Sequence, residues 1–198
     1  MIALIDYGAG NLTSVRKALS ELGAEVYVPQ KAADLDSALA VIVPGVGNFQ
    51  RTGALDRDWR SGIIDSVERG RPLLGICLGL QWLFEGSTEA PGSEGLSLMT
   101  GLCDRLEASW PLKVPHVGWN ALEFPRPSRL FEGIQEGSQV YFTHSYAAPV
   151  THDAIAVTTH GVPFASAVER GHVFGVQFHP EKSGDIGLRV LRNFLDAL

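Results

Sequence analysis

The first half of the chain alternates short, apolar, β-branched runs with amphipathic segments, and this alternation limits the possible folds more than any other feature. Such alternation is typical of a parallel sheet whose strands are connected by helices packed on its faces. We expect strands at 2–6, 25–28, 40–43 and 72–76, and helices at 12–22, 52–68 and 78–84. The sequence therefore predicts an α/β fold with a mostly parallel central sheet flanked by helices.

The pattern of apolar and polar residues changes after about residue 103, where short apolar runs follow one another with frequent turn residues between them. We expect strands at 121–124, 139–146, 154–159, 164–169 and 173–178, and a last helix at 187–195 with apolar residues at helical spacing. Residues 85–95 are predicted to form a loop. A chain of 198 residues without repeats or a domain linker suits one domain, 1–198, with a β-rich C-terminal half.

Composition excludes several classes of function. The net charge is −6 and Lys and Arg form no basic run, which argues against nucleic acid as a partner. No apolar stretch approaches the ~20 residues that span a bilayer, and no basic flank of a signal peptide is present, so we expect a cytoplasmic protein without membrane contact. Cys77 and Cys103 are therefore expected to be free thiols.

The strongest local motif is Gly75-Ile76-Cys77-Leu78-Gly79, where a buried strand runs directly into a helix. The two glycines permit a sharp turn that exposes the central side chain at the edge of the sheet, as in a nucleophile elbow. The helix N-terminus favours the thiolate, and the Leu78 N–H can hold a developing oxyanion. A lone cysteine in an apolar run is more often a small core residue, which is our interpretation of Cys103.

A nucleophilic thiol requires a base, and His179 has the most suitable surroundings of the six histidines. It ends an apolar strand and is followed by Pro180 and Glu181. In an extended chain residues i and i+2 lie on one side, so Glu181 can bind the far ring nitrogen and stabilise the imidazolium. The alternative is an exposed histidine beside a solvated glutamate. No HExxH or cysteine-pair spacing suggests a metal.

The segment Gly8-Ala9-Gly10-Asn11-Leu12-Thr13 follows a strand and opens a helix, as a dinucleotide fingerprint would. Thr13 occupies the place of the third glycine, and the second strand ends without a carboxylate for a ribose hydroxyl. We therefore expect no nicotinamide and no other cofactor.

The elbow, the Gln81 that follows it and the later His-Pro-Glu together resemble the class I glutamine amidotransferases, over the whole chain. The resemblance implies that Cys77, His179 and Glu181 form the catalytic triad. It also implies an oxyanion hole made by Leu78 and by the loop that contains Gly45, Val46 and Gly47. Glutamine would be held by Gln81 and by the backbone of His144, Ser145 and Tyr146.

Two further segments, 6–11 and 113–120, look like those of the glutaminase subunits of imidazole glycerol phosphate synthases, and 141–146 and 179–183 fit the same subfamily. Val117 and Leu80 stand where that subfamily often has Met. The resemblance implies a heterodimer with a (β/α)₈-barrel cyclase subunit. That subunit takes the ammonia and makes imidazole glycerol phosphate and AICAR in histidine biosynthesis. No phosphate-binding glycine-lysine loop is evident here, which agrees with an acceptor that binds to another chain.

Four residues are candidates for the surface near that partner: Asn11, Trp119, Tyr141 and Lys182. For Trp119 the alternative is a core tryptophan. Two alternatives of function also remain, a glutaminase serving another acceptor and a non-catalytic regulatory module on the same scaffold. Because glycine makes peptide reorientation inexpensive, we further expect the 44–47 loop to switch between a resting and an assembled oxyanion hole.

Overall fold

The structure is a computed structural model that describes residues 1–107, 109 and 111–198. Its main sheet has seven strands in the order β10-β11-β12-β4-β3-β1-β2. The strands are β1 (Ile2–Leu4), β2 (Val26–Tyr27), β3 (Ala40–Gly45), β4 (Leu73–Cys77), β10 (Ala154–His160), β11 (Val162–Arg170) and β12 (Val173–Val176). The five from β12 to β2 are parallel, whereas β10 and β11 extend the sheet as an antiparallel hairpin. The expected α/β fold is confirmed.

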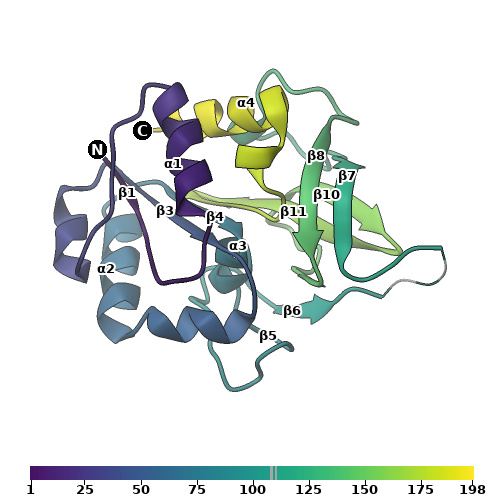
Figure 1. The fold of residues 1–198 in the computed structure, drawn as a ribbon, viewed down its shortest axis with the longest axis horizontal. Helices are drawn as coiled ribbons and strands as arrows, with labels where there is room; N and C mark the ends of the chain where they lie inside the picture. The colour runs from purple at the N-terminus through teal and green to yellow at the C-terminus, as the bar shows by residue number, and fades with distance from the viewer. Residues whose placement is uncertain (108, 110) are drawn as a thin grey trace.

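Helices cover both faces of this sheet (Figure 1). α1 (Leu12–Glu21) and α4 (Gly184–Leu195) pack on one face, and α2 (Arg57–Glu68) and α3 (Leu78–Leu83) pack on the other. Neighbouring strand residues enter different cores, since Ile42 packs with α1 and α4 while Val43 packs with α2 and α3. Successive side chains of a strand point to opposite faces of the sheet. Because helices cover both faces, every residue of a central strand faces a core and is apolar.

The helical boundaries differ from the expected ones at two places. The helix expected at 52–68 is a 3₁₀ turn, η2 (Phe49–Ala54), followed by α2. The Asp56 side chain separates them, because it accepts hydrogen bonds from the N–H groups of Asp58 and Trp59 and so caps α2. α4 begins at Gly184, directly after the 3₁₀ turn η4 (Pro180–Lys182). Two further 3₁₀ turns are η1 (Ala32–Ser37) and η3 (Arg129–Phe131).

The β-rich half contains two small additional sheets. One joins β5 (Gly86–Ser87), β6 (Leu102–Arg105) and β9 (Tyr146–Ala147), and the other pairs β7 (His116–Ala121) with β8 (Gln139–His144). The strand expected at 121–124 is wrong, since the strand lies at His116–Ala121 and pairs antiparallel with β8. The run expected at 139–146 is divided into β8 and β9 at Ser145, whose carbonyl accepts from the Leu106 N–H.

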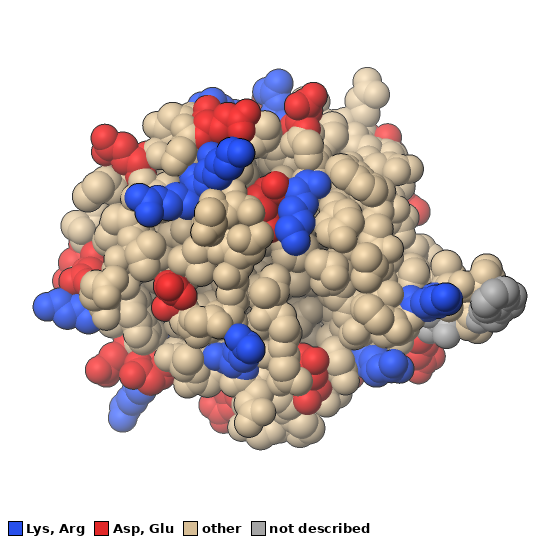
Figure 2. Space-filling view, in the orientation of Figure 1, with Lys and Arg blue, Asp and Glu red and all other residues tan. Residues whose placement is uncertain are grey.

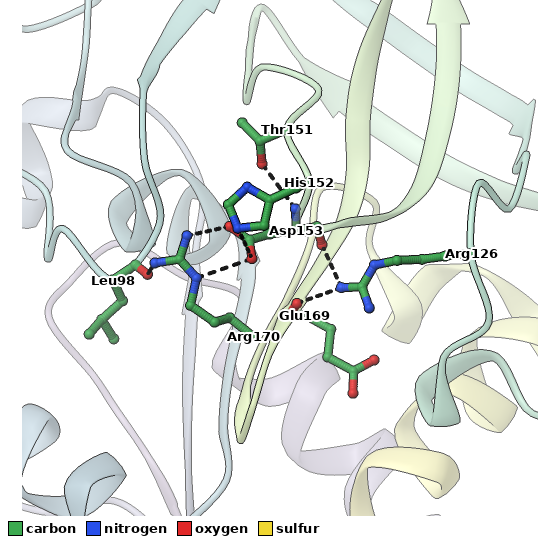
Figure 3. A network of polar contacts seen from close by, with 7 residues as sticks. All are labelled: Leu98, Arg126, Thr151, His152, Asp153, Glu169 and Arg170. Atoms are coloured by element: carbon green, nitrogen blue, oxygen red, sulfur yellow. Dashed lines mark hydrogen bonds and ion pairs between the residues drawn. The ribbon is translucent and has the colours of Figure 1, made fainter.

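A network of charged side chains ties the β10–β11 hairpin to neighbouring loops (Figure 3). The Arg170 guanidinium binds the carboxylate of Asp153 and donates to the Leu98 carbonyl at 2.8 Å. Arg126 donates to the carbonyls of Asp153 and Glu169 at 3.2 and 2.7 Å. These contacts fix the hairpin, whose strand β11 is separated from β4 by β12.

The surface carries charges of both signs. Lys and Arg are interspersed with Asp and Glu on the face drawn in Figure 2. Over the described ranges, no helix has the length and apolar character that crossing a membrane requires. The same residues contain no group of three or more His, Cys, Asp or Glu side chains placed to hold a metal ion.

Candidate active site

Cys77 ends β4 and immediately precedes α3, in the strained backbone conformation that a nucleophile elbow requires. Its φ is 54° and its ψ −106°, a combination that non-glycine residues rarely adopt. The flanking glycines make the turn possible. A Cβ on Gly75 would lie 2.5 Å from the Gly79 carbonyl oxygen, and a Cβ on Gly79 would overlap the Val43 carbonyl. The thiol is therefore held at the carboxyl end of the sheet, 5% exposed.

His179 is brought close to Cys77 because the strand before it, β12, is the direct parallel neighbour of β4, with Val176 paired to Ile76. The Nδ1 atom of His179 lies 2.8 Å from Glu181 Oε1, and both side chains are only 2% exposed. Burial lowers the pKa of His179, but its contacts with Cys77 and Glu181 outweigh burial and raise this pKa to about 9. The three residues expected to form a triad are thus brought together.

A cavity of about 380 Å³ opens beside the thiol. Its walls come from the segment after β3, from the elbow and α3, from the loop at Glu89, and from β8 and β9. The lining residues are Val46, Gly47, Asn48, Cys77, Leu78, Gln81, Glu89, Pro115, Thr143, His144, Ser145 and Tyr146. All the residues expected to hold glutamine line this one cavity, together with most of the expected oxyanion loop.

Glu89 adds a carboxylate that sequence reasoning missed, because it lies in a segment with only loop character. Its Oε2 atom accepts the Phe49 N–H at 2.7 Å, which fixes the side chain at the cavity wall. A carboxylate at this wall can bind an ammonium group of a ligand. The sequence gives one signal for such a carboxylate, namely an acidic residue within a loop rich in Gly and Ser.

Two glutamine side chains connect the cavity wall to the thiol. Gln81 Nε2 donates to the Tyr146 carbonyl at 2.7 Å and to Gln177 Oε1 at 3.1 Å. Gln177 Nε2 in turn lies 3.6 Å from the Cys77 sulfur. Gln177 is fully buried and was not identified from the sequence, although a glutamine inside an otherwise apolar strand was its signal.

His144 lines the cavity but is not placed to act as a base. Its Nδ1–H donates to the Tyr146 carbonyl at 2.9 Å, so its Nε2 must accept from His116 Nδ1 at 3.1 Å. Burial lowers the pKa of His144 to about 3 and that of His116 to about 4. Both imidazoles are therefore uncharged at neutral pH, and they hold the Tyr146 carbonyl in place.

The oxyanion loop lies next to the elbow, since Gly45 is paired with Cys77 in the β3–β4 ladder. The Leu78 N–H belongs to the first residue of α3, where no intrahelical acceptor exists. The Val46 N–H, by contrast, donates to the Ala9 carbonyl at 2.8 Å. One of the expected donors is thus turned towards the 6–11 loop in this structure.

Three of the four partner-surface candidates lie together. Trp119 and Tyr141 face each other across β7 and β8 with ring centroids 6.1 Å apart, and Lys182 Nζ lies 5.8 Å from the Tyr141 ring. Trp119 is 54% exposed, so its interpretation as a core residue is wrong. Asn11 caps α1 by accepting from the Ser14 N–H at 3.4 Å.

This chain matches one protein family, and two relatives similar to it in sequence carry the same name. The family model described as glutamine amidotransferase class-I matches residues 3–198. A protein of Moorella thermoacetica named imidazole glycerol phosphate synthase subunit HisH is 49% identical, over 98% of this chain and 93% of its own length. A Deinococcus radiodurans protein of the same name is 46% identical, over 98% of this chain and 92% of its length.

Two solved structures have the same fold as this chain. A crystal structure described as a glutamine amidotransferase has a TM-score of 0.76 at 21% identity, covering 100% of this chain and 98% of its own. PurLQS from Thermotoga maritima has a TM-score of 0.74 at 22% identity, over 98% of this chain and 97% of that one. The extent of the family match and the identity to these relatives place the chain in the class I glutamine amidotransferases.

Proposed function

We propose that this chain is the glutaminase subunit of an imidazole glycerol phosphate synthase, with Cys77 as nucleophile, His179 as acid and base, and Glu181 as the residue that orients the imidazole. The observation that carries the proposal is the buried His179–Glu181 pair beside a cysteine on a strained elbow. The shared name of relatives at 46–49% identity supports the choice of synthase.

The reaction follows from these positions. The Cys77 thiolate attacks the side-chain carboxamide carbon of glutamine, and the C=O electron pair moves to oxygen to give a tetrahedral oxyanion. The imidazolium of His179 gives its proton to the departing nitrogen, and ammonia leaves as the γ-glutamyl thioester forms. His179 then accepts a proton from the water that attacks the thioester. The C–S bond breaks, glutamate is released, and the Cys77 thiolate and His179 imidazolium are regenerated.

Substrate contacts come from the cavity. Its volume of about 380 Å³ suits one amino acid, and the Glu89 carboxylate would bind the α-ammonium group of glutamine. Gln81 and the backbone of residues 144–146 would hold the remainder. The Leu78 N–H would donate to the oxyanion, and the Val46 N–H would do so after rotation of the Gly45–Val46 peptide away from Ala9.

The ammonia would pass to a (β/α)₈-barrel cyclase subunit in a heterodimer. The exposed Trp119 with Tyr141 and Lys182 would contact that subunit, as would Asn11. Tryptophan and tyrosine are enriched among the residues that contribute most to binding energy near the centres of protein interfaces. The assignment of these four residues to the interface is part of the proposal, as is the assignment of the triad.

The test separates ammonia production from ammonia use. In the complex with the cyclase subunit, Cys77→Ala should abolish glutamine-dependent synthesis of imidazole glycerol phosphate and leave synthesis from added ammonium salt intact. Cys103→Ala is the matched control, because Cys103 is fully buried outside the cavity, and it should retain both activities. Glutamine-dependent synthesis by the Cys77 variant would refute the assignment. Ammonia-dependent synthesis of a different product would identify another acceptor.

A further inference from the structure

The hydroxyl of Tyr7 is buried and has no hydrogen-bond partner among the residues that the structure describes. Tyr7 follows β1, in the 6–11 loop that begins with the Gly8 N–H bound to Asp6 Oδ1 at 3.0 Å. A buried hydroxyl without a partner usually costs about 1–3 kcal/mol. Such a group therefore calls for an explanation, and its surroundings provide one.

The hydroxyl lies directly against Gly45. A Cβ on Gly45 would overlap Tyr7 Oη and would lie 3.2 Å from the Ala9 carbonyl oxygen. Tyr7 Oη and the Ala9 oxygen are thus on the same side of Gly45. This is also the side towards which the Val46 N–H points, since it donates to Ala9.

Rotation of the Gly45–Val46 peptide would bring the Gly45 carbonyl oxygen to the side where Tyr7 and Ala9 lie. In a trans peptide the C=O and N–H bonds point in opposite directions, so rotating the N–H away from Ala9 turns the Gly45 carbonyl towards Ala9. Two carbonyl oxygens would then face each other, away from water. The rotated state requires a donor at this place, or it carries an unsatisfied acceptor.

We propose that Tyr7 is a positioning residue for glutamine hydrolysis, whose hydroxyl donates to the Gly45 carbonyl once the Val46 N–H has turned towards the oxyanion. Its hydroxyl lacks a partner here because the loop is in the resting arrangement. The inference rests on the proposed function and concerns the same site.

Two further observations agree with this role. Burial, with a smaller contribution from the nearby Cys77, raises the pKa of the Tyr7 hydroxyl, so the phenol keeps the proton that it would donate. Arg51 lies against Gly47 and donates to the Gly8 carbonyl at 2.8 Å. The 6–11 loop is therefore tied to the oxyanion loop, and Tyr7 stays in place while one peptide rotates.

The experiment measures glutamate release by Tyr7→Phe in three settings: the isolated chain, the complex with the cyclase subunit, and this complex with imidazole glycerol phosphate bound. The phenylalanine ring keeps the packing and removes only the donor. We expect the ligand-stimulated kcat to fall roughly fivefold to tenfold, the loss that one hydrogen bond supplies. The KM for glutamine and the rate of the isolated chain should not change. The melting temperature of the isolated chain should not fall, because the hydroxyl that is removed has no partner in the resting arrangement.

Tyr27→Phe is the matched control, because Tyr27 donates its hydroxyl proton to the Asp34 carbonyl at 2.7 Å, outside the residues of the site. It should retain full stimulation. Full stimulation in Tyr7→Phe would overturn the inference, and so would an equal loss in all three settings accompanied by a lower melting temperature. Absence of glutamate release by the unmodified complex would instead overturn the proposed function itself.

A direct observation is available as well. In a crystal structure of the ligand-bound complex, with a covalent glutamine analogue on Cys77, Tyr7 Oη should lie about 2.7 Å from the Gly45 carbonyl oxygen. A Gly45 carbonyl that still points away from Tyr7 in that structure would contradict the inference.

Discussion

The two cysteines of this chain differ in their access to the cavity. Cys77 lines the cavity, whereas Cys103 is fully buried with its sulfur 3.8 Å from the Gln81 carbonyl oxygen. Burial raises the pKa of the Cys103 thiol, which leaves it protonated and unreactive. A diazoketone analogue of glutamine should therefore label Cys77 alone, as measured by mass spectrometry of proteolytic fragments. Equal labelling of both residues would show that the cavity does not select the thiol.

The His179–Glu181 pair predicts a pH dependence. The pKa of His179 is raised from 6.5 to about 9, so the stability contributed by its imidazolium is complete below about pH 6.5 and is lost as the pH rises through about 9. Glu181→Gln removes one of the two contacts that raise this pKa. The alkaline decline of kcat/KM, and of the free energy of unfolding, should both move to lower pH.

We further expect Glu181→Gln to reduce kcat on the order of 10⁴-fold, as loss of the orienting carboxylate does in comparable triads. Steady-state glutamate release and chemical denaturation, each followed across the pH range, provide the measurement. An unchanged alkaline decline would mean that Glu181 does not hold the imidazolium.

Sequence reasoning selected Cys77, His179 and Glu181 as triad candidates because each lies at or just after the end of a strand, within a recognisable local motif. It missed Gln177, Glu89 and the role that we propose for Tyr7, because these depend on contacts between distant segments. Gln177 is separated from Cys77 by a hundred residues, and only the β12–β4 register brings them together. No local pattern carries that information.

At the scale of the element, the elbow depends on close approach of backbone to backbone. Gly79→Ala would place a methyl group on the Val43 carbonyl, and backbone atoms cannot give way as a flexible side chain can. We expect a loss of about 1–3 kcal/mol in stability, and a fall in kcat on the order of a hundredfold because the thiol is displaced. Urea denaturation and glutaminase assays test both.

Gly53→Ala is the control for this substitution, since a Cβ at Gly53 meets nothing within 4 Å and its φ is not positive. It should leave both stability and kcat close to those of the unmodified chain. If the two variants behave alike, the close packing at Gly79 is not what the elbow requires.

The elements also differ in how far the sequence predicts them. The central strands were predicted within a few residues, because strands buried on both faces are uninterrupted apolar runs. β7 was misplaced, since its alternating burial includes Gly118, Trp119 and Asn120 and gives no regular apolar pattern. Its position is set by pairing with β8, which is a tertiary contact.

At the scale of the whole molecule, the network in Figure 3 holds the antiparallel end of the sheet. The Asp153 side chain is 4% exposed and Arg170 is 42% exposed, so solvent screens part of their attraction. Asp153→Asn should lower the free energy of unfolding by about 1–2 kcal/mol and leave KM for glutamine unchanged. Denaturant titration and steady-state kinetics check this. A changed KM would show that the network reaches the cavity.

The order of strands in the main sheet has a consequence for synthesis of the chain on the ribosome. The proposed nucleophile, Cys77, lies at the end of β4, whereas the proposed base, His179, follows β12. β12 inserts between β4 and the β10–β11 hairpin. A nascent chain therefore displays Cys77 long before His179 has emerged. Under the proposed function, the thiol lacks its proton acceptor throughout that interval. An unfinished polypeptide would then be unable to consume glutamine before it could bind the cyclase subunit.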